Sequence, residues 1–223
     1  MCADPLEDFT NPIEINGTTI PFSTTAEHVG IVRSVAGNSA ALAARFASHR
    51  RALASILHSG LARKHRGNPA SNIKVEKLYA TPVLLSGLAS LVLSKSDINT
   101  IDRYYVNVLC GLLKLHNKTP RCVVLFLAGS LPASALLHLR QVGLFSMICR
   151  SGYRNGILFN YAIDYFASKS QRKSSWFSQI VRICEKYSLP SPLSLLRHPP
   201  DKESFKIFAI ILGRLTANRI KFP

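Results

Sequence analysis

The sequence has 223 residues, and its 47% of apolar residues is enough to bury a core, which excludes a wholly disordered chain. Its 28 Lys and Arg against 12 Asp and Glu give a formal net charge of +16. This excess of positive charge favours a polyanionic partner, with nucleic acid first and an anionic membrane surface second; the alternative is that part of it only solvates helix faces.

The first residues predict β-structure. Apolar residues alternate on both sides of Asn16-Gly17, namely Ile13, Ile15, Ile20 and Phe22. Both central positions of a type I′ turn need a positive φ, which Asn and Gly adopt readily, so this pattern predicts a hairpin. A further short apolar run, Val29–Val32, follows Glu27-His28.

From Gly37 onward the apolar spacing becomes helical. Asn38 or Ser39 can cap a helix that runs to about Gly60 or beyond. Arg51 faces away from the apolar stripe of this helix, whereas Arg45 and Arg50 lie nearer its edges. The stripe is predicted to consist of Leu42, Phe46, Leu53, Leu57 and Leu61. The basic run 63–66 then leads into Gly67-Asn68-Pro69, which we interpret as a loop.

The rest of the chain predicts further helices, joined by linkers rich in Ser, Pro, Gly and basic residues. We expect a helix over 75–93 with a kink or break at Pro82, and another from about Ser96 to Leu112. Further helices are expected over 120–127, 132–150, 157–168, 175–187 and 202–217. The predicted fold class is therefore mainly α, with a short N-terminal β-hairpin followed by a multi-helix bundle and further helices.

Two uncharged stretches, 78–94 and 122–139, approach the length of a membrane span. They have 17 and 18 residues and contain Pro, Gly and Ser, whereas a span needs about 20 mostly apolar residues. We interpret them as buried core helices, and a membrane-associated helical protein is the alternative. Residues 1–10 carry three acids and no base, so no signal peptide is predicted and the expected location is intracellular, in the cytoplasm or nucleus.

Residues able to support catalysis or hold a metal do not gather anywhere in the sequence. The cysteines at 2, 110, 122, 149 and 184 lack Cys-x-x-Cys or zinc-ligand spacing, so most are expected to be small buried side chains in a reducing compartment. The close acidic groupings are Glu7-Asp8, Asp97 with Asp102, and Asp201 with Glu203. They are interpreted as helix caps, first-turn acids or solvated faces. We therefore predict no catalytic residue, no metal, no cofactor and no small-molecule substrate.

Several segments, taken in order, resemble the C-terminal part of the reverse transcriptases of non-LTR (LINE-type) retrotransposons. The first two are IEINGTTI at 13–20 and AEHVGI at 26–31. The next are FASHRRAL at 46–53, the stretches 60–63 and 65–69, and YATPVLLSGL at 79–88. The last runs from Pro120-Arg121 through 129–132 to 138–140. The resemblance covers about residues 11 to 160 and is weak from there to Pro223.

The resemblance implies three regions. Residues 1–34 correspond to the end of the palm, where Glu27, His28 and Gly30 are primer-grip-like. Residues 35–115 correspond to the thumb, and 116–223 to the helical region that follows it, weakly assigned from 160. The family's paired catalytic carboxylates, in a Phe/Tyr-x-Asp-Asp turn, have no counterpart here, because the chain contains no Asp-Asp pair. The expected protein is thus a truncated family member that is no enzyme on its own, and the alternative is that it has no selected function.

Positive charge is densest between residues 33 and 77. Nine Lys or Arg lie there against one acid, Glu76. Phosphates repeat along a nucleic acid, so a helix and loop with repeated bases can follow them without reading the sequence. In the family the thumb packs on the template–primer duplex. We therefore predict non-specific binding to the backbone of RNA or an RNA/DNA duplex by Arg45, Arg50, Arg51, Arg63, Lys64 and Arg66.

Overall fold

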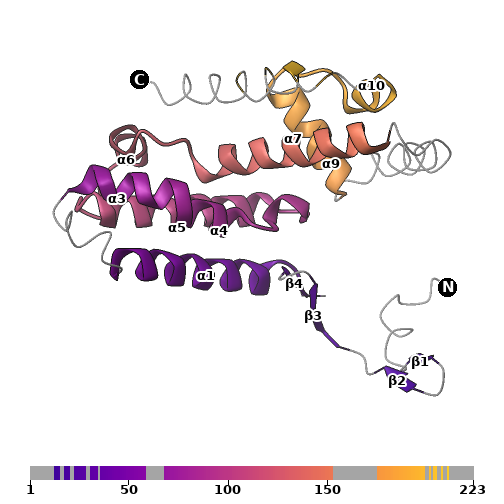
Figure 1. Cartoon of the computed structure of the whole chain (residues 1–223), viewed down its shortest axis with the longest axis horizontal. Coiled ribbons are helices and arrows are strands. Elements are labelled where there is room, and N and C mark those ends of the chain that lie inside the picture. Colours follow the sequence, from indigo (N-terminus) through magenta and orange to yellow (C-terminus); the bar gives the residue numbers. More distant parts are fainter. Residues whose placement is uncertain are drawn as a thin grey trace. The chain divides into compact units, whose positions relative to one another are not determined.

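A computed structural model describes residues 13–15, 18–20, 23–28, 31–34, 36–58, 68–152 and 175–198, together with 201, 203, 204, 207 and 210. Most of these residues are helical, and strands occur only before residue 35, so the predicted fold class is confirmed. Figure 1 follows the elements from the N-terminal strands to α10. The helix expected over 157–168 lies outside the described residues.

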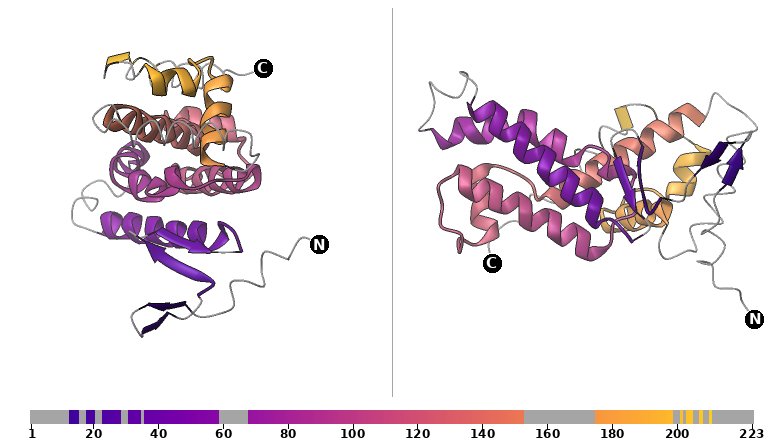
Figure 2. Two further views of the ribbon diagram at one scale, coloured as in Figure 1. Left: turned by 90° about the vertical axis from the view of Figure 1, so that its right-hand side faces the viewer. Right: turned by 90° about the horizontal axis from the view of Figure 1, so that it is seen from below.

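The N-terminal strands form two antiparallel hairpins. Strands β1 (Ile13–Ile15) and β2 (Thr18–Ile20) pair around the predicted Asn-Gly turn, with Ile13 opposite Ile20. Strands β3 (Thr25–His28) and β4 (Ile31–Ser34) form the second hairpin, with Thr25 opposite Ser34. The sequence predicted only the first, because the apolar run Val29–Val32 spans the reversal between β3 and β4. The two hairpins are separate two-stranded sheets (Figure 2).

The chain divides into two compact units, Met1–Ala44 and Arg45–Pro223. Helix α1 (Ser39–His58) begins in the first unit and ends in the second, and its bounds confirm the helix expected from Asn38 or Ser39. The predicted division at 34/35 and 115/116 was based on family resemblance and stays a prediction.

Residues 59–67 lie outside the described part of the chain, and the residues after them form a helix that the sequence did not predict. Helix α3 (Pro69–Val75) has Pro69 in its first turn and Asn68 as its cap, whose side chain accepts a bond from the Ala70 N–H. The loop interpretation was therefore wrong for Pro69, since Pro in the first turn removes a donor that a helix start leaves unpaired anyway, whereas Asn68 has extended backbone before the helix. Helix α3 continues into the π-helix η2 (Glu76–Ala80) and α4 (Thr81–Leu85), which ends at Ser86. The 3-10 turn η3 (Leu88–Ser90) follows after Gly87, whose φ is positive.

Three further helices surround the core of the second unit. Helix α5 (Lys95–Leu112) starts at a capping box in which Ser94 and Asp97 bond each other's backbone N–H. It packs against α3, α6 (Arg121–Ala128) and α7 (Ala133–Gly152). These bounds agree with the predicted helices. The fully buried side chains Ile101, Tyr105 and Leu109 lie four residues apart, so one face of α5 supplies the centre of this core.

Two C-terminal helices form a second buried cluster with α7. Helix α9 (Trp176–Lys186) was predicted, whereas α10 (Pro192–Arg197), with six residues, was not. Their shared cluster includes Phe145 and Cys149 of α7, Ile180 and Cys184 of α9, and Leu196 of α10. Residues 203, 204, 207 and 210 are also helical, within the stretch predicted over 202–217. Cys110, Cys149 and Cys184 are buried and unpaired, as expected of small core side chains.

Candidate nucleic-acid interface

The outer face of α1 carries two exposed arginines, Arg50 and Arg51. Successive helical residues are about 100° apart, so these two side chains project in different directions from a broad exposed strip. The neighbouring exposed positions on this strip are Ala54 and Ser55, whose small side chains leave the guanidinium groups prominent. Arg51 donates a hydrogen bond to Ser48 Oγ at 3.3 Å, which orients its side chain along the helix.

Arg45 is only partly exposed, which agrees with its predicted place at the edge of the apolar stripe. Leu42 is buried, and Phe46, Leu53 and Leu57 are half-buried. The predicted basic residues Arg63, Lys64 and Arg66 lie outside the described residues, as do Leu61 and Gly30. Glu27 is exposed in β3, and His28 ends that strand opposite Ile31. The structure therefore describes three of the six predicted nucleic-acid contacts.

The inner face of α1 is held by a buried polar network that the sequence did not predict. His49 and Glu76 have no exposed side-chain surface, and Nε2 of the imidazole lies 3.3 Å from Oε1 of the carboxyl. Nδ1 of His49 lies 2.9 Å from the Tyr104 hydroxyl, and that hydroxyl donates to the Phe46 carbonyl at 3.2 Å. The rings of Phe46 and Tyr104 stack with centroids 4.1 Å apart. Helix α1 is therefore joined to η2 and α5 through specific polar bonds.

The bonding pattern assigns the protons of this network. The hydroxyl of Tyr104 has one proton, which goes to the Phe46 carbonyl, so Nδ1 of His49 must be the donor to the Tyr104 oxygen. Nε2 and Oε1 then meet with one proton between them. Because burial removes both groups from water, this proton and the Thr81 hydroxyl, which donates to the same oxygen at 2.7 Å, are what satisfy Oε1. Oε2 of Glu76 is buried without a hydrogen-bond partner among the described residues.

The charge of Arg50 reaches this network from outside. Burial raises the pKa of the Tyr104 hydroxyl, the positive charge of Arg50 lowers it, and the negative charge of Glu76 raises it further. Arg50 thus lies close enough to Tyr104 for a Coulombic effect while its side chain stays exposed.

The segment that carries Glu76 is fixed on its other side by Lys77. Nζ of Lys77 donates to the carbonyl oxygens of Ala128 and Gly129, at 2.6 and 2.7 Å, at the C-terminal end of α6. Burial lowers the pKa of Lys77, and the neighbouring carboxyl of Glu76 raises it. A cation at a helix C-terminus is favourable because unpaired carbonyl oxygens gather there. Lys77, although inside the most basic segment of the sequence, therefore has a structural role.

His49 was missed, although its position contained the necessary signal. It lies three residues after Phe46 and four before Leu53, so it completes the helical stripe that these two residues define. A histidine on an apolar stripe predicts a buried imidazole with polar partners. The partners themselves, Glu76 and Tyr104, are 27 and 55 residues away, and no local spacing could have identified them.

Comparisons of this chain with protein-family models, with curated proteins and with solved structures find no match.

Within the described ranges, no three His, Cys, Asp or Glu side chains lie close enough together to share a metal ion. No single helix of the described part is long and apolar enough to cross a bilayer. The pair 121–128 and 133–150, bent by 61°, meets that requirement in length and composition.

Proposed function

We propose that this chain is a thumb-like helical module, related to the C-terminal part of non-LTR retrotransposon reverse transcriptases, that binds a nucleic-acid duplex through its phosphates. The observation that carries the proposal is the paired arginines Arg50 and Arg51 on the exposed strip of α1, beside small side chains that permit close approach of a backbone. The order of the family-like segments supports the origin, and the absence of an Asp-Asp pair supports a role in binding and not in nucleotide transfer.

The buried network makes this helix face suitable for binding. Side chains that are already oriented lose less conformational entropy when they contact phosphates. His49 holds the helix one residue before the pair, Arg51 is oriented by Ser48, and Arg50 is close to Tyr104. The acids nearby offer little competition, because Glu76 is buried within the network. Contacts of this kind carry no base information, so the proposed binding is independent of sequence.

The direct test is binding of a labelled RNA/DNA hybrid and a labelled DNA duplex, measured by fluorescence anisotropy over a range of salt concentrations. Replacing both arginines, Arg50→Gln with Arg51→Gln, should weaken binding to all sequences about equally. It should also reduce the slope of log affinity against log salt by about 0.9 for each lost phosphate contact on B-form DNA.

A matched pair of arginines provides the control. Arg103 and Arg197 are exposed on α5 and α10, so Arg103→Gln with Arg197→Gln removes the same charge from other surfaces. This control should keep both the affinity and the salt slope. The proposal fails if the Arg50/Arg51 variant binds like the parent at low salt with an unchanged slope, or if the control loses as much affinity. Either result would show that the exposed strip of α1 does not contact the nucleic acid specifically.

The second candidate is a membrane-associated helical protein, favoured only by the bent pair α6 and α7. Cell fractionation distinguishes the two. A protein inserted in a bilayer resists carbonate extraction, whereas a nucleic-acid-bound protein is released by high salt or nuclease. Much of α7 packs inside the second unit, where Leu137, Phe145 and Cys149 are buried, and this favours the first candidate.

A further inference from the structure

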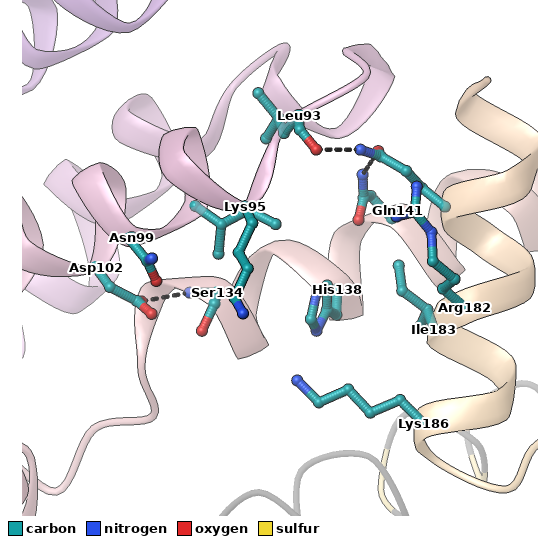
Figure 3. A pocket seen from close by; sticks show the side chains of 12 residues that line it. Leu93, Lys95, Asn99, Asp102, Ser134, His138, Gln141, Arg182, Ile183 and Lys186 are labelled. Atoms are coloured by element: carbon teal, nitrogen blue, oxygen red, sulfur yellow. Dashed lines mark hydrogen bonds between the residues drawn. The ribbon is translucent and has the colours of Figure 1, made fainter. Parts of the chain in front are cut away.

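A cavity of about 450 Å³ lies between the start of α5, the first half of α7 and the middle of α9 (Figure 3). This volume is within the range of pockets that bind small molecules, roughly 300–1,000 Å³. All of the lining residues belong to the second unit and are separate from the exposed strip of α1. Neither the basic segment nor the family-like segments of the sequence indicate this site.

Three cations from two helices line the cavity, and the two lysines among them converge. Lys95 is in the first turn of α5, and Arg182 and Lys186 lie one turn apart on α9. Figure 3 shows the Lys95 and Lys186 side chains extending toward the same space, beside Ser134 and His138. Nε of Arg182 donates to the Ser178 carbonyl at 3.2 Å, which directs the guanidinium group back along α9, away from the two ammonium groups (Figure 3). Positive charges gathered in one cavity raise the local concentration of anions.

The one carboxylate in the lining has partners of its own. Oδ1 of Asp102 accepts a hydrogen bond from the Ser134 N–H at 2.8 Å and so caps the start of α7, and Oδ2 lies 3.8 Å from Arg121. Its charge is therefore partly compensated by groups other than the cavity's cations. With three cations and one carboxylate among the lining residues, the cavity has two net positive charges.

Buried neutral groups form the floor of the cavity. Gln141 and Gln179 are 2% and 7% exposed, and Nε2 of Gln141 donates to Oε1 of Gln179 at 3.3 Å. Gln179 in turn donates to the Leu93 carbonyl. His138 is 8% exposed, and its Nδ1 lies 3.0 Å from the Tyr187 hydroxyl. These bonds hold the polar lining in place without a ligand, so the site is largely preformed.

The field inside the cavity is positive enough to affect His138. Burial is the main cause that lowers the pKa of this imidazole, to about 4, and the charge of Lys186 lowers it further. The imidazole is therefore neutral near pH 7 and does not repel or attract an anion by its own charge. An anion placed beside Lys186 would offset that part of the shift and raise the pKa of His138.

We infer that this cavity binds a phosphate dianion, either as inorganic phosphate or as the phosphate group of a nucleotide. The two net charges match a dianion, and the ammonium groups of Lys95 and Lys186 supply donors from two different helices, while Arg182 adds positive charge to the lining. The cavity exceeds the size of a phosphate, so a nucleoside attached to it has room beside Ile98 and Ile183. This goes beyond the proposed duplex binding and replaces the sequence-based expectation that no small molecule binds.

Isothermal titration calorimetry of the full chain tests the inference with three probes: inorganic phosphate, adenosine 5′-monophosphate and adenosine. Phosphate and the monophosphate should bind, and adenosine should not. Equal affinity for the two phosphates would identify free phosphate as the ligand, whereas tighter binding of the monophosphate would identify a nucleotide. Absence of binding by both phosphates at millimolar concentration would overturn the inference.

The variant Lys95→Gln with Lys186→Gln should weaken phosphate binding at least tenfold. Its matched control, Lys114→Gln with Lys118→Gln, removes two exposed lysines outside the cavity and should bind like the parent. If the Lys95/Lys186 variant fails to fold, Lys186→Gln alone serves the same purpose. Binding that survives these changes, or that is equally weakened in the control, would show that phosphate contacts the general basic surface and not this cavity.

A titration of the His138 ring by NMR gives a second, local readout. Saturating phosphate should raise the pKa of His138 while leaving the exposed His198 unchanged, because only His138 shares the cavity with Lys186. The other charged groups that line this cavity are Lys95, Asp102 and Arg182. No change in His138 with saturating phosphate would contradict binding at this site.

Discussion

Nε2 of His49 lies 3.3 Å from Oε1 of Glu76, and both side chains are without exposed surface. This pair joins α1 to η2, and the same carboxyl oxygen accepts the Thr81 hydroxyl at 2.7 Å. Groups of this kind are costly to bury unless each is hydrogen-bonded, so loss of one partner leaves the others without compensation. The position of the arginine strip on α1 consequently depends on residues of η2, α4 and α5.

The network predicts a measurable cost for removing a single hydroxyl. Thr81→Val keeps the shape of the side chain but leaves Oε1 of Glu76 without its bond from Thr81. We expect the free energy of unfolding to fall by about 1–3 kcal/mol, the usual cost of an unsatisfied buried polar group. Urea denaturation at pH 7 measures it. The control Thr100→Val removes an exposed hydroxyl that bonds its own helix, and its stability should stay within about 0.5 kcal/mol of the parent.

The stability of the second unit should fall on acidification because of His138. Its pKa is lowered from 6.5 to about 4 when the chain folds, so the unfolded chain binds a proton more readily. The contribution of His138 to the free energy of unfolding is fully present above pH 6.5 and is lost as the pH falls toward 4. Between pH 7 and pH 5 the loss should be about 2 kcal/mol. Urea denaturation at the two pH values, compared with His138→Gln, isolates this contribution.

The His138→Gln variant should be less stable at pH 7 but should lose less stability between pH 7 and pH 5 than the parent. Replacement of the exposed His198 by Gln is the control and should leave the pH dependence of the parent intact. A parent protein that is equally stable at both pH values would show that the His138 imidazole is not held neutral by its burial.

The hairpins should be the least protected part of the described backbone. Each sheet has two strands, residues 23–27 are exposed, and isolated two-stranded hairpins are marginally stable in water. We therefore expect the amides of Ile31–Ser34 to exchange at least a hundredfold faster than those of Ile101–Leu109 in α5. Hydrogen exchange followed by NMR or mass spectrometry measures this ratio. Equal protection of both segments would contradict this prediction and would mean that contacts outside the two-stranded sheet stabilise the strands.

Nucleotide transfer is not expected from this chain. Polymerases of the proposed family hold metal ions with paired carboxylates, and the acids whose roles the structure describes are used otherwise: Glu76 in the buried network, Asp97 in a cap and Asp102 at α7. Purified protein with Mg²⁺, a template–primer and labelled deoxynucleotides should give no extension. Template-dependent incorporation that disappears on Glu203→Gln or Asp201→Asn would contradict the assignment.

Local sequence signals located most of the helices. The structure shows two capping boxes that the prediction had not used, one at Ser94–Asp97 and one at Ser175–Ser178, which satisfy backbone groups within their own turn. A similar signal at Asn68-Pro69, a cap and a first-turn proline, was interpreted as part of a loop. Helix α10 was missed because six residues provide too little periodicity to recognise.

The sequence by itself determined the helical class, the first hairpin, most helix boundaries and the basic character of α1, since these depend on residues within a few turns of one another. Only the tertiary structure decided the partners of His49 and the convergence of Lys95 with Lys186, which are 91 residues apart in the chain. Such pairings arise when apolar faces pack and carry polar groups together, and the spacing along the chain does not record which faces meet.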